Sequence, residues 1–424
     1  MGTVVKKKPS QNKQVTNHHM RDKLLHNAIG VFAKLLLLAT ILLVIFGVIA
    51  FGRGYRIDLL NNTLSPTGIL AISSSPRAAE VYINGDFKGA TDVNINLPPG
   101  EYTVEVKKEG YISYKKTVKL KGEIVQVIDP ILFPINPSLS PVTNIGIQKA
   151  IQIEQTGKII LLSQTNDQEK SGIYLYEADD KPLNIFPPLK PLLSIKALPV
   201  DVDLLETTLN FSPDYKEMIA TFYKDGQLIA TYLLSTNEEN TQPLDISNSK
   251  ATLITAWEEE HAKNTLKVLE ALPKKLRAQA ISSFSKIKFS PDENKILYEA
   301  SASASLPMVI DPPLIGANQT QEERSILPQY KYVYDRKEDK NFLIADEKTD
   351  LVDIYWYTDS KRIVYREPQT ISISQYDGQH KQVVYSGPLE DSFVAVAPNG
   401  KILVLANLNP RSNKLPDLYQ VGIR

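Results

Sequence analysis

Residues 35–51 read LLLLATILLVIFGVIAF. None of these seventeen residues is charged, and Thr40 has the only polar side chain. Backbone amides in hydrocarbon have no water to bond, so a run of this kind must be helical in a membrane. Spanning takes about 17–25 apolar residues, and apolar residues just before Leu35 lengthen the run. The sequence therefore predicts a transmembrane helix over residues 28–52.

Two other interpretations of this run are open. A buried core helix is one, although an uninterrupted apolar helix of this length is unusual inside a β-rich domain. A cleaved signal peptide is the other, because Val48 and Ala50 are small enough for cleavage after Ala50. The segment before the run is long for a signal peptide, and the polar stretch that usually precedes a cleavage site is missing. We therefore expect an uncleaved signal-anchor.

Charge on the two sides of the run indicates its orientation. Net charge is +6 before the run and −6 after it. Seven basic residues precede it, namely Lys6, Lys7, Lys8, Lys13, Arg21, Lys23 and Lys34. Because the basic side stays inside, we expect a single-pass protein of the cell membrane, with a cytoplasmic basic tail over 1–27 and extracytoplasmic C-terminal domains. Residues 53–67 read as a polar spacer, and the acidic exterior part argues against nucleic-acid binding.

Residues 68–133 alternate between short apolar strands and turn residues, the pattern of a small β-sandwich. Asn84-Gly85 predicts a type I′ hairpin turn. In residues 101–106, Tyr102, Val104 and Val106 share one face. Further along, Val118 and Leu120 face inward. We expect six strands in this segment.

The turn residues of this segment resemble the PEGA domain. The positions that match are Ser74, Pro76, Ala79, Val81, Tyr82, Asn84, Gly85, Gly89, Pro99, Gly100, Tyr102, Val104, Gly110 and Tyr111. Asp92 departs from the pattern, because many family members have proline there. The resemblance implies an immunoglobulin-like surface module of bacterial and archaeal envelopes, extracytoplasmic, with a spacer or binding role.

Three prolines, Pro134, Pro137 and Pro141, predict a stiff linker over 134–143. From residue 144 to 424 an apolar strand, a tight polar turn and a second apolar strand recur. Copies lie at 151–163, 209–223, 287–300, 354–367 and 394–407, and second strand pairs at 172–186, 331–345 and 371–385. Repeats of about four strands predict a β-propeller. The overall fold class expected is all-β, behind an N-terminal transmembrane helix.

The tetrads FSPD at 211–214 and 289–292 resemble the repeats of WD-like periplasmic propellers of the Tol-associated type. Asp214 and Asp292 are expected to bond backbone amides in these turns. The other three copies lack the SPD form and the spacing is irregular, which implies insertions. We count five blades and leave six or more open.

Two insertions interrupt the repeats. Residues 257–284 read as two short helices with apolar stripes, carried by Leu266, Leu269, Leu272, Leu276 and Ala280. These stripes either pack onto the blades, which we expect, or form a docking hairpin. Residues 301–329 form a long Pro- and Ser-rich loop, which indicates a mobile or binding loop.

Catalytic, cofactor and metal motifs are absent from the sequence. There is no GxSxG, HExxH or P-loop, and no cysteine. His261 follows three glutamates, which could suggest metal ligation. Adjacent residues on a helix point in different directions, so these side chains are not expected to converge on a metal. Asp214, Asp292 and Asp359 recur at turns, which favours a structural role. We therefore assign no catalytic, cofactor-binding or metal residue, and expect that the protein is not an enzyme.

Aromatic residues are frequent in the repeats. The set is Tyr174, Tyr176, Tyr223, Tyr298, Tyr332, Tyr334, Trp356, Tyr357 and Tyr365. Such rings fill the space between blades or line a binding face, and the sequence does not distinguish the two. The expected function is extracytoplasmic binding or scaffolding, with a cell-wall polymer, a glycan or a protein as partner. The alternatives are a propeller-based hydrolase of glycan or peptide and a ligand sensor that works through a partner.

Overall fold

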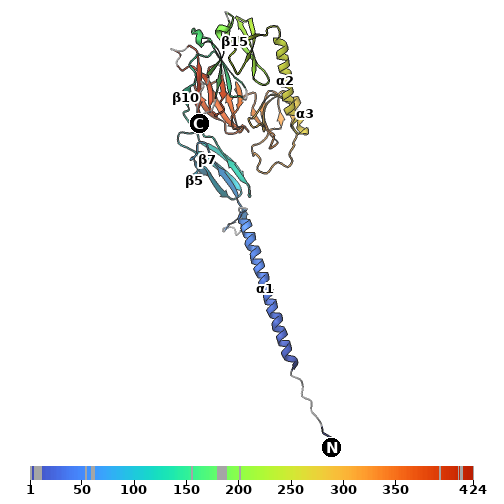
Figure 1. Ribbon diagram of the computed structural model, residues 1–424. Coiled ribbons are helices and arrows are strands. Elements are labelled where there is room, and N and C mark those ends of the chain that lie inside the picture. Colours follow the sequence, from blue (N-terminus) through green and yellow to red (C-terminus); the bar gives the residue numbers. More distant parts are fainter. Residues whose placement is uncertain are drawn as a thin grey trace. The chain divides into compact units, whose positions relative to one another are not determined.

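The computed structural model describes residues 2–3, 12–52, 55–58, 63–153, 156–178, 189–199, 202–390, 393–408, 410 and 414–423 (Figure 1). The chain divides into two compact units. The first consists of Met1–Ala71, Asn94–Tyr102 and Lys119–Val127. The second consists of Ile72–Val93, Thr103–Val118 and Ile128–Arg424.

The first unit begins with a long helix, α1 (Asn12–Gly52). Its stretch Val31–Ala50 has a mean hydropathy of 2.7 and no buried residue, so it is long and apolar enough to cross a membrane. The basic tail expected over residues 1–27 is helical from Asn12 onward. No proline lies between Asn12 and Gly52, so nothing in the sequence stops the helix from extending toward the N-terminus.

Strands follow α1 in the same unit. The pair β1 (Tyr55–Asp58) and β2 (Thr63–Pro66) is antiparallel. It lies within residues 53–67, which were expected to be a spacer. A three-stranded sheet has the order β6-β3-β9, formed by β3 (Gly68–Ile72), β6 (Val93–Leu97) and β9 (Val125–Ile128). Strand β6 was not predicted, although Val93, Ile95 and Leu97 alternate with two asparagines as residues of a half-buried strand do.

Most of a four-stranded sheet from residues 80–120 belongs to the second unit. Its strand order is β5-β4-β7-β8. Its strands are β4 (Glu80–Ile83), β5 (Asp86–Ala90), β7 (Gly100–Lys107) and β8 (Tyr114–Leu120). Asn84 and Gly85 both have positive φ, 52° and 91°, which confirms the hairpin turn. Val104, Val106 and Val118 are buried, as their alternation predicted.

Five further antiparallel sheets of four strands each occur among the described residues of the second unit. The first sheet has β11 (Lys149–Ile153), β12 (Lys158–Ser163), β13 (Gly172–Glu177) and β14 (Leu189–Ser194). The second sheet has β15 (Asp203–Phe211), β16 (Glu217–Lys224), β17 (Gln227–Ser235) and β18 (Leu244–Asp245). Both are meanders, in which each strand pairs with the next along the chain.

The remaining three sheets come next in the chain. The third sheet has β19 (Phe284–Phe289), β20 (Lys295–Ala300), β23 (Lys331–Asp335) and β24 (Lys340–Ala345). The fourth sheet has β25 (Asp353–Trp356), β26 (Arg362–Arg366), β27 (Thr370–Gln375) and β28 (Gln382–Ser386). The fifth sheet has β29 (Val394–Val396), β30 (Ile402–Ala406), β31 (Asp417–Gly422) and, on the outside, β10 (Ser138–Pro141).

Strand β10 corrects the predicted linker. Residues 138–141 pair with β31 in antiparallel register, with Leu139 opposite Val421. The N-terminal and C-terminal ends of the region 138–423 therefore meet in one sheet. Prolines kept this strand from being predicted, yet proline is compatible with a strand at the edge of a sheet.

One turn recurs in all five sheets, between the first and second strands. A side-chain oxygen accepts a hydrogen bond from the backbone N–H two residues later, at 2.8–3.2 Å. The acceptors are Thr156, Asp214, Asp292, Asp359 and Asn399, and the residue after each has positive φ. The predicted role of Asp214 and Asp292 is confirmed.

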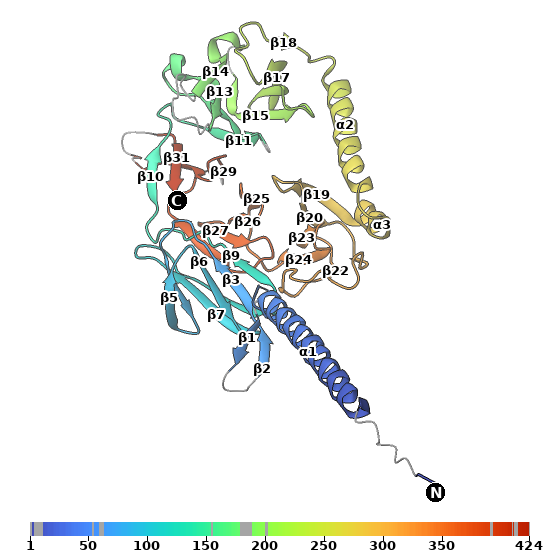
Figure 2. The same cartoon turned by 60° about the horizontal axis from the view of Figure 1, so that its bottom comes forward.

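Apolar faces of neighbouring sheets pack against each other in series. Leu162 of the first sheet shares a core cluster with Phe222 of the second, and Leu161 shares one with Leu405 of the fifth. The fourth sheet packs on the fifth through a cluster that includes Val364 and Val404. It packs on the third through a cluster that includes Ile363 and Val333. Figure 2 shows the first strands β11, β19, β25 and β29 around a common centre.

Helices α2 (Lys250–Glu270) and α3 (Lys274–Ser283) lie between the second and third sheets in the chain (Figure 1). Helix α2 begins seven residues before the predicted Trp257. Trp257 packs with Ile219 of the second sheet. Leu269, Leu272, Leu276 and Ala280 pack with aromatic residues of the third sheet, whereas Leu266 is 43% exposed. The stripes are therefore mainly packing surfaces.

The loop 301–329 is held in place along its length. Its short strands β21 (Ala304–Ser305) and β22 (Ser325–Ile326) pair with each other. Buried Asp339 accepts backbone hydrogen bonds from Val309 and Ile310 and forms an ion pair with Arg324. These contacts fix the loop, so its length alone does not make it mobile.

Candidate functional site

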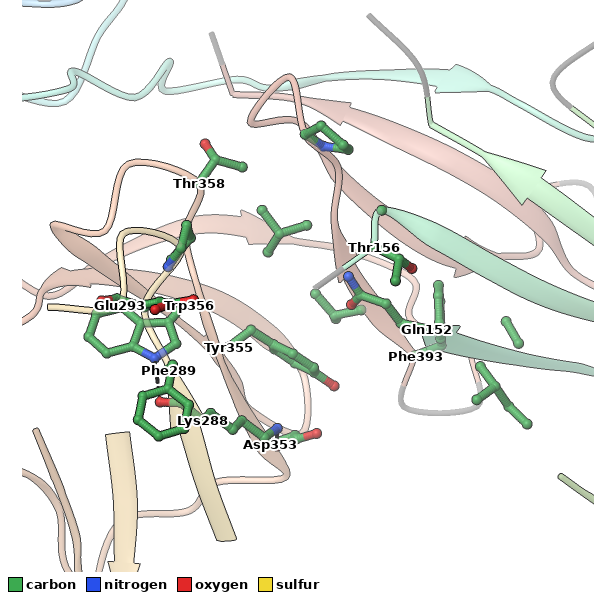
Figure 3. A pocket seen from close by; sticks show the side chains of 18 of the residues that line it. Gln152, Thr156, Lys288, Phe289, Glu293, Asp353, Tyr355, Trp356, Thr358 and Phe393 are labelled. Carbon is green, nitrogen blue, oxygen red and sulfur yellow. Dashed lines mark hydrogen bonds and ion pairs between the residues drawn. The ribbon is translucent and has the colours of Figure 1, made fainter. Parts of the chain in front are cut away.

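A cavity of about 780 Å³ lies among the first strands of the second unit (Figure 3). Strands β11, β19, β25 and β29 supply its walls, and Val268 of α2 also reaches it. The side chains labelled in Figure 3 are Gln152, Thr156, Lys288, Phe289, Glu293, Asp353, Tyr355, Trp356, Thr358 and Phe393. The volume is that of a site for a small molecule or a few sugar rings.

The polar centre of the cavity is an ion pair between β19 and β25. Lys288 Nζ lies 3.5 Å from Asp353 Oδ1 and donates to the carbonyl of Ile354 at 3.3 Å. The same ammonium lies 5.1 Å from the centre of the Tyr355 ring, a cation–π distance. Asp353 also accepts from the backbone N–H of Ile354. These contacts fix Lys288 at the wall.

Aromatic rings flank this ion pair. The indole Nε1 of Trp356 donates to the Lys288 carbonyl at 2.9 Å, which fixes the ring across two sheets. Phe289, Tyr355 and Trp356 are each partly exposed, so each leaves ring surface open to the cavity. In Figure 3, Tyr355 and Trp356 lie on one wall and Gln152 and Thr156 on the opposite wall.

Turn residues line the cavity beside the strands. Four lining residues lie in or next to the turns that follow the first strands, namely Thr156, Glu293, Thr358 and Pro398. Because the recurring turn fixes each of these segments, the lining is set by the repeat itself. Strand alternation then directs one set of side chains of each first strand toward the centre.

Most predicted aromatic residues pack between sheets. Tyr298, Tyr332, Tyr357 and Tyr365 are at most 1% exposed, and burial raises the pKa of Tyr365 to about 12. Of the aromatic residues singled out from the sequence, Trp356 lines the cavity. Four other lining residues were not predicted from the sequence, namely Lys288, Phe289, Asp353 and Tyr355. The available signal was their place in the first strand of a repeat.

The recurring aspartates are structural. Burial disfavours the charged form of Asp292, but hydrogen bonds from Asn294 and Ser290 outweigh it and lower its pKa. A backbone hydrogen bond from Lys216 lowers the pKa of Asp214. Each carboxylate also accepts from the serine two residues earlier, at 2.8 Å for Asp214 and 2.7 Å for Asp292. These hydrogen bonds all lie within the turn that contains the aspartate.

His261 and His380, two of the five histidines of the chain, lie outside the cavity lining. His261 of α2 is near Tyr215, with ring centres 6.4 Å apart, in a smaller hollow of about 330 Å³. His380 packs on Tyr114 at 4.8 Å between ring centres. Burial, and then Lys116, lower the pKa of His380. In the described part of the chain no three His, Cys, Asp or Glu residues form a group able to hold a metal.

A second hollow, of about 420 Å³, borders the fourth sheet. Its charged residues are paired: Arg77 with Asp92, Lys361 with Asp129, and Arg362 with Asp359. The Arg362 guanidinium also donates to the carbonyl of Asp129 at 2.8 Å. Because these charged side chains pair with one another, we interpret this hollow as structural.

Comparison with known proteins identifies one part of the chain. Residues 67–131 match the PEGA domain family. This PEGA match agrees with the segment 68–133 expected from the turn residues. No curated protein matches the chain. A solved structure of a structural genomics protein of unknown function from Bacteroides thetaiotaomicron VPI-5482 is similar over 81% of this chain and 90% of that chain, with 10% identity and a TM-score of 0.23.

Proposed function

We propose that this protein is a single-pass membrane protein whose PEGA domain and C-terminal sheets lie outside the cytoplasm and bind an envelope component. The observation that carries the proposal is the pairing of an exposed apolar helix, Val31–Ala50, with a preformed cavity in the same chain. Seven basic residues before the run support an inside N-terminus. The PEGA match supports extracytoplasmic placement of this domain and of the sheets C-terminal to it.

We also propose that the five four-stranded sheets form a β-propeller of the WD-like, Tol-associated type. Three features support it: meander order, the recurring turn, and first strands that line one cavity. Strand β10 would then complete the last blade, as a strand from the start of a propeller commonly does. Helix α2, which packs on both the second and the third sheet through Trp257 and Leu269, would fill the joint between those blades.

Binding is favoured over hydrolysis by the contacts of the polar groups in the cavity. Asp353 is engaged by Lys288 and by a backbone amide. Glu293 is exposed in its turn. A general acid and base pair needs two groups poised on one reacting bond, and no observation favours that arrangement. The ligand expected is a cell-wall polymer or glycan, with a protein partner as the other possibility.

Intrinsic fluorescence tests the binding role, because the chain has two tryptophans, Trp257 and Trp356. In full-length Trp257→Phe protein held in lipid nanodiscs, Trp356 is the one indole and reports on the cavity. Soluble fragments of cell wall should change its emission with saturation. In the matched variant Trp356→Phe, the remaining Trp257 should not respond. Equal responses of the two variants, or none from either, would contradict binding in this cavity.

A further inference from the structure

Arg366, in β26, is a buried charge with too few partners. Its side chain is 2% exposed. Among the described residues, neither its Nε nor its Nη1 has a hydrogen-bond partner. Burial lowers the pKa of this guanidinium. A buried cation without a counter-ion is strongly destabilising, so this arginine is a feature that packing alone does not explain.

Register places Arg366 beside the cavity. It pairs directly with Asp353 across β25 and β26. Residues opposite each other in an antiparallel ladder have their side chains on the same face, and Tyr355, two residues after Asp353, shares that face. Both Asp353 and Tyr355 line the cavity.

Charge at this wall does not balance. Lys288 and Arg366 bring two positive charges to the part of the wall that carries Asp353, and within the described lining Asp353 is the carboxylate that opposes them. Glu293, the other acid of the lining, is exposed in a turn of the third sheet. The wall therefore complements a ligand that carries one negative charge. Arginine with a carboxylate or phosphate forms two parallel hydrogen bonds.

We propose that the cavity binds an acidic sugar unit, whose carboxylate or phosphate oxygens contact Arg366 and Lys288 while its ring packs on Trp356 and Phe289. This inference rests on the proposed binding function and specifies its ligand. Aromatic rings with a free face suit the apolar side of a sugar. Carboxylate and phosphate present the same anionic oxygens, so either source fits the site.

The test uses full-length Trp257→Phe protein in nanodiscs of neutral phosphatidylcholine, so that lipid does not compete as an anion. Three probes are titrated: a galacturonic acid trimer, inorganic phosphate, and a neutral N-acetylglucosamine trimer. A change in Trp356 emission with the acidic trimer or with phosphate is expected. The probe that binds identifies whether a carboxylate or a phosphate supplies the anionic oxygens. The neutral trimer should bind about tenfold more weakly or worse than the acidic trimer.

Arg366→Met in the same background separates recognition from folding. It removes an uncompensated buried charge and keeps the volume, so the thermal midpoint should stay the same or rise. Affinity for the anion should fall about tenfold or more. The matched control Arg77→Met deletes an exposed arginine outside the cavity and should bind normally.

Other results would overturn the inference. If Arg366→Met binds the anion normally, or if the neutral trimer binds as tightly as the acidic one, recognition of charge is wrong while the binding role stands. If Arg366→Met lowers the thermal midpoint and leaves affinity intact, the arginine is structural. If wall fragments bind but neither anion does, the acidic ligand is excluded; if wall fragments also fail, the proposed function fails with it.

Discussion

At the scale of single residues, the recurring turn is the feature that the five four-stranded sheets share. Its hydrogen-bonding residues were predictable where an Asp follows Ser-Pro, at Asp214 and Asp292, because the short acidic side chain reaches backbone amides. The positive φ of the next residue was not predictable, since Tyr215, Glu293 and Ser360 occupy it along with two glycines. Non-glycine residues rarely adopt this conformation, so no residue type signals it at those three positions.

Gly157 should be the least replaceable of these turn residues. Its φ is +69°, and an added Cβ would lie 2.6 Å from Cγ of Pro398, in the turn between β29 and β30 of the fifth sheet. Gly157→Ala should therefore lower the free energy of unfolding by about 2–4 kcal/mol, from left-handed strain plus overpacking. Urea titration followed by near-ultraviolet circular dichroism measures this change.

Gly226→Ala is the matched control for that substitution. Gly226 has φ +74°, but no atom lies within 4 Å of an added Cβ. Its cost should be about 1 kcal/mol, from backbone strain alone. Equal losses for the two variants would show that Gly157 does not touch the fifth sheet, and would contradict the packing of the first sheet on the fifth.

At the scale of elements, strand pairs were predicted well where two apolar runs flank a tight polar turn, as in β19 with β20 and β25 with β26. Strand β10 was hidden because Pro137 and Pro141 resemble a linker, and its partner β31 is far away in the sequence. Long-range pairing of this kind leaves no local pattern. Helix α2 was underestimated at its N-terminus because the apolar stripe that marked it begins at Leu266, well after residues 250–256.

The helical insertion gives a prediction at this scale. Leu276 of α3 is fully buried against the third sheet. Leu276→Ala should destabilise the protein by about 2–5 kcal/mol through the cavity it leaves. Leu266→Ala removes the same atoms from a side chain that is 43% exposed, so its cost should be below about 1 kcal/mol. Thermal unfolding of both variants checks this, and similar losses would contradict the packing of α3 on the third sheet.

At the scale of the whole molecule, the cavity joins residues that the sequence keeps apart. Lys288 and Asp353 are separated by 65 positions, and Gln152 lies still further away. The repeats and the PEGA domain were predictable from local patterns, but the position of these side chains depends on how the sheets pack. The cavity has no local motif, so of the predicted aromatic residues Trp356 lines it, while Lys288, Asp353 and Tyr355 were marked only by their place in the first strand of a repeat.

The contact of β8 with the fourth sheet should depend on pH. Tyr114 packs on His380, Gln375 Nε2 donates to the Tyr114 hydroxyl at 2.9 Å, and Lys116 donates to Gln375 at 3.2 Å. Burial and Lys116 lower the pKa of His380 while Asp377 opposes them, so the folded state holds the neutral ring. The stability it contributes is complete above about pH 6.5, the unperturbed value, and is lost as pH falls through the lower folded pKa.

Thermal midpoints between pH 7.5 and pH 5 measure this effect. The midpoint of the wild-type protein should fall with pH, and His380→Asn should flatten the curve in this range. Asparagine suits the control because His380 has φ +56°, a conformation that asparagine tolerates. An unchanged slope in His380→Asn would assign the pH dependence to other groups and reject this role of His380.

The proposed function depends most on α1, which should span a membrane and hold the C-terminal sheets outside. The chain has no cysteine, so a single introduced thiol reports its own location. Thr3→Cys and Ser301→Cys, both at exposed positions, are treated in intact cells with a membrane-impermeant maleimide. We expect labelling at position 301 before permeabilisation and at position 3 only after it. Labelling at position 3 in intact cells with position 301 protected, or loss of the N-terminal segment from the mature protein, would contradict this topology.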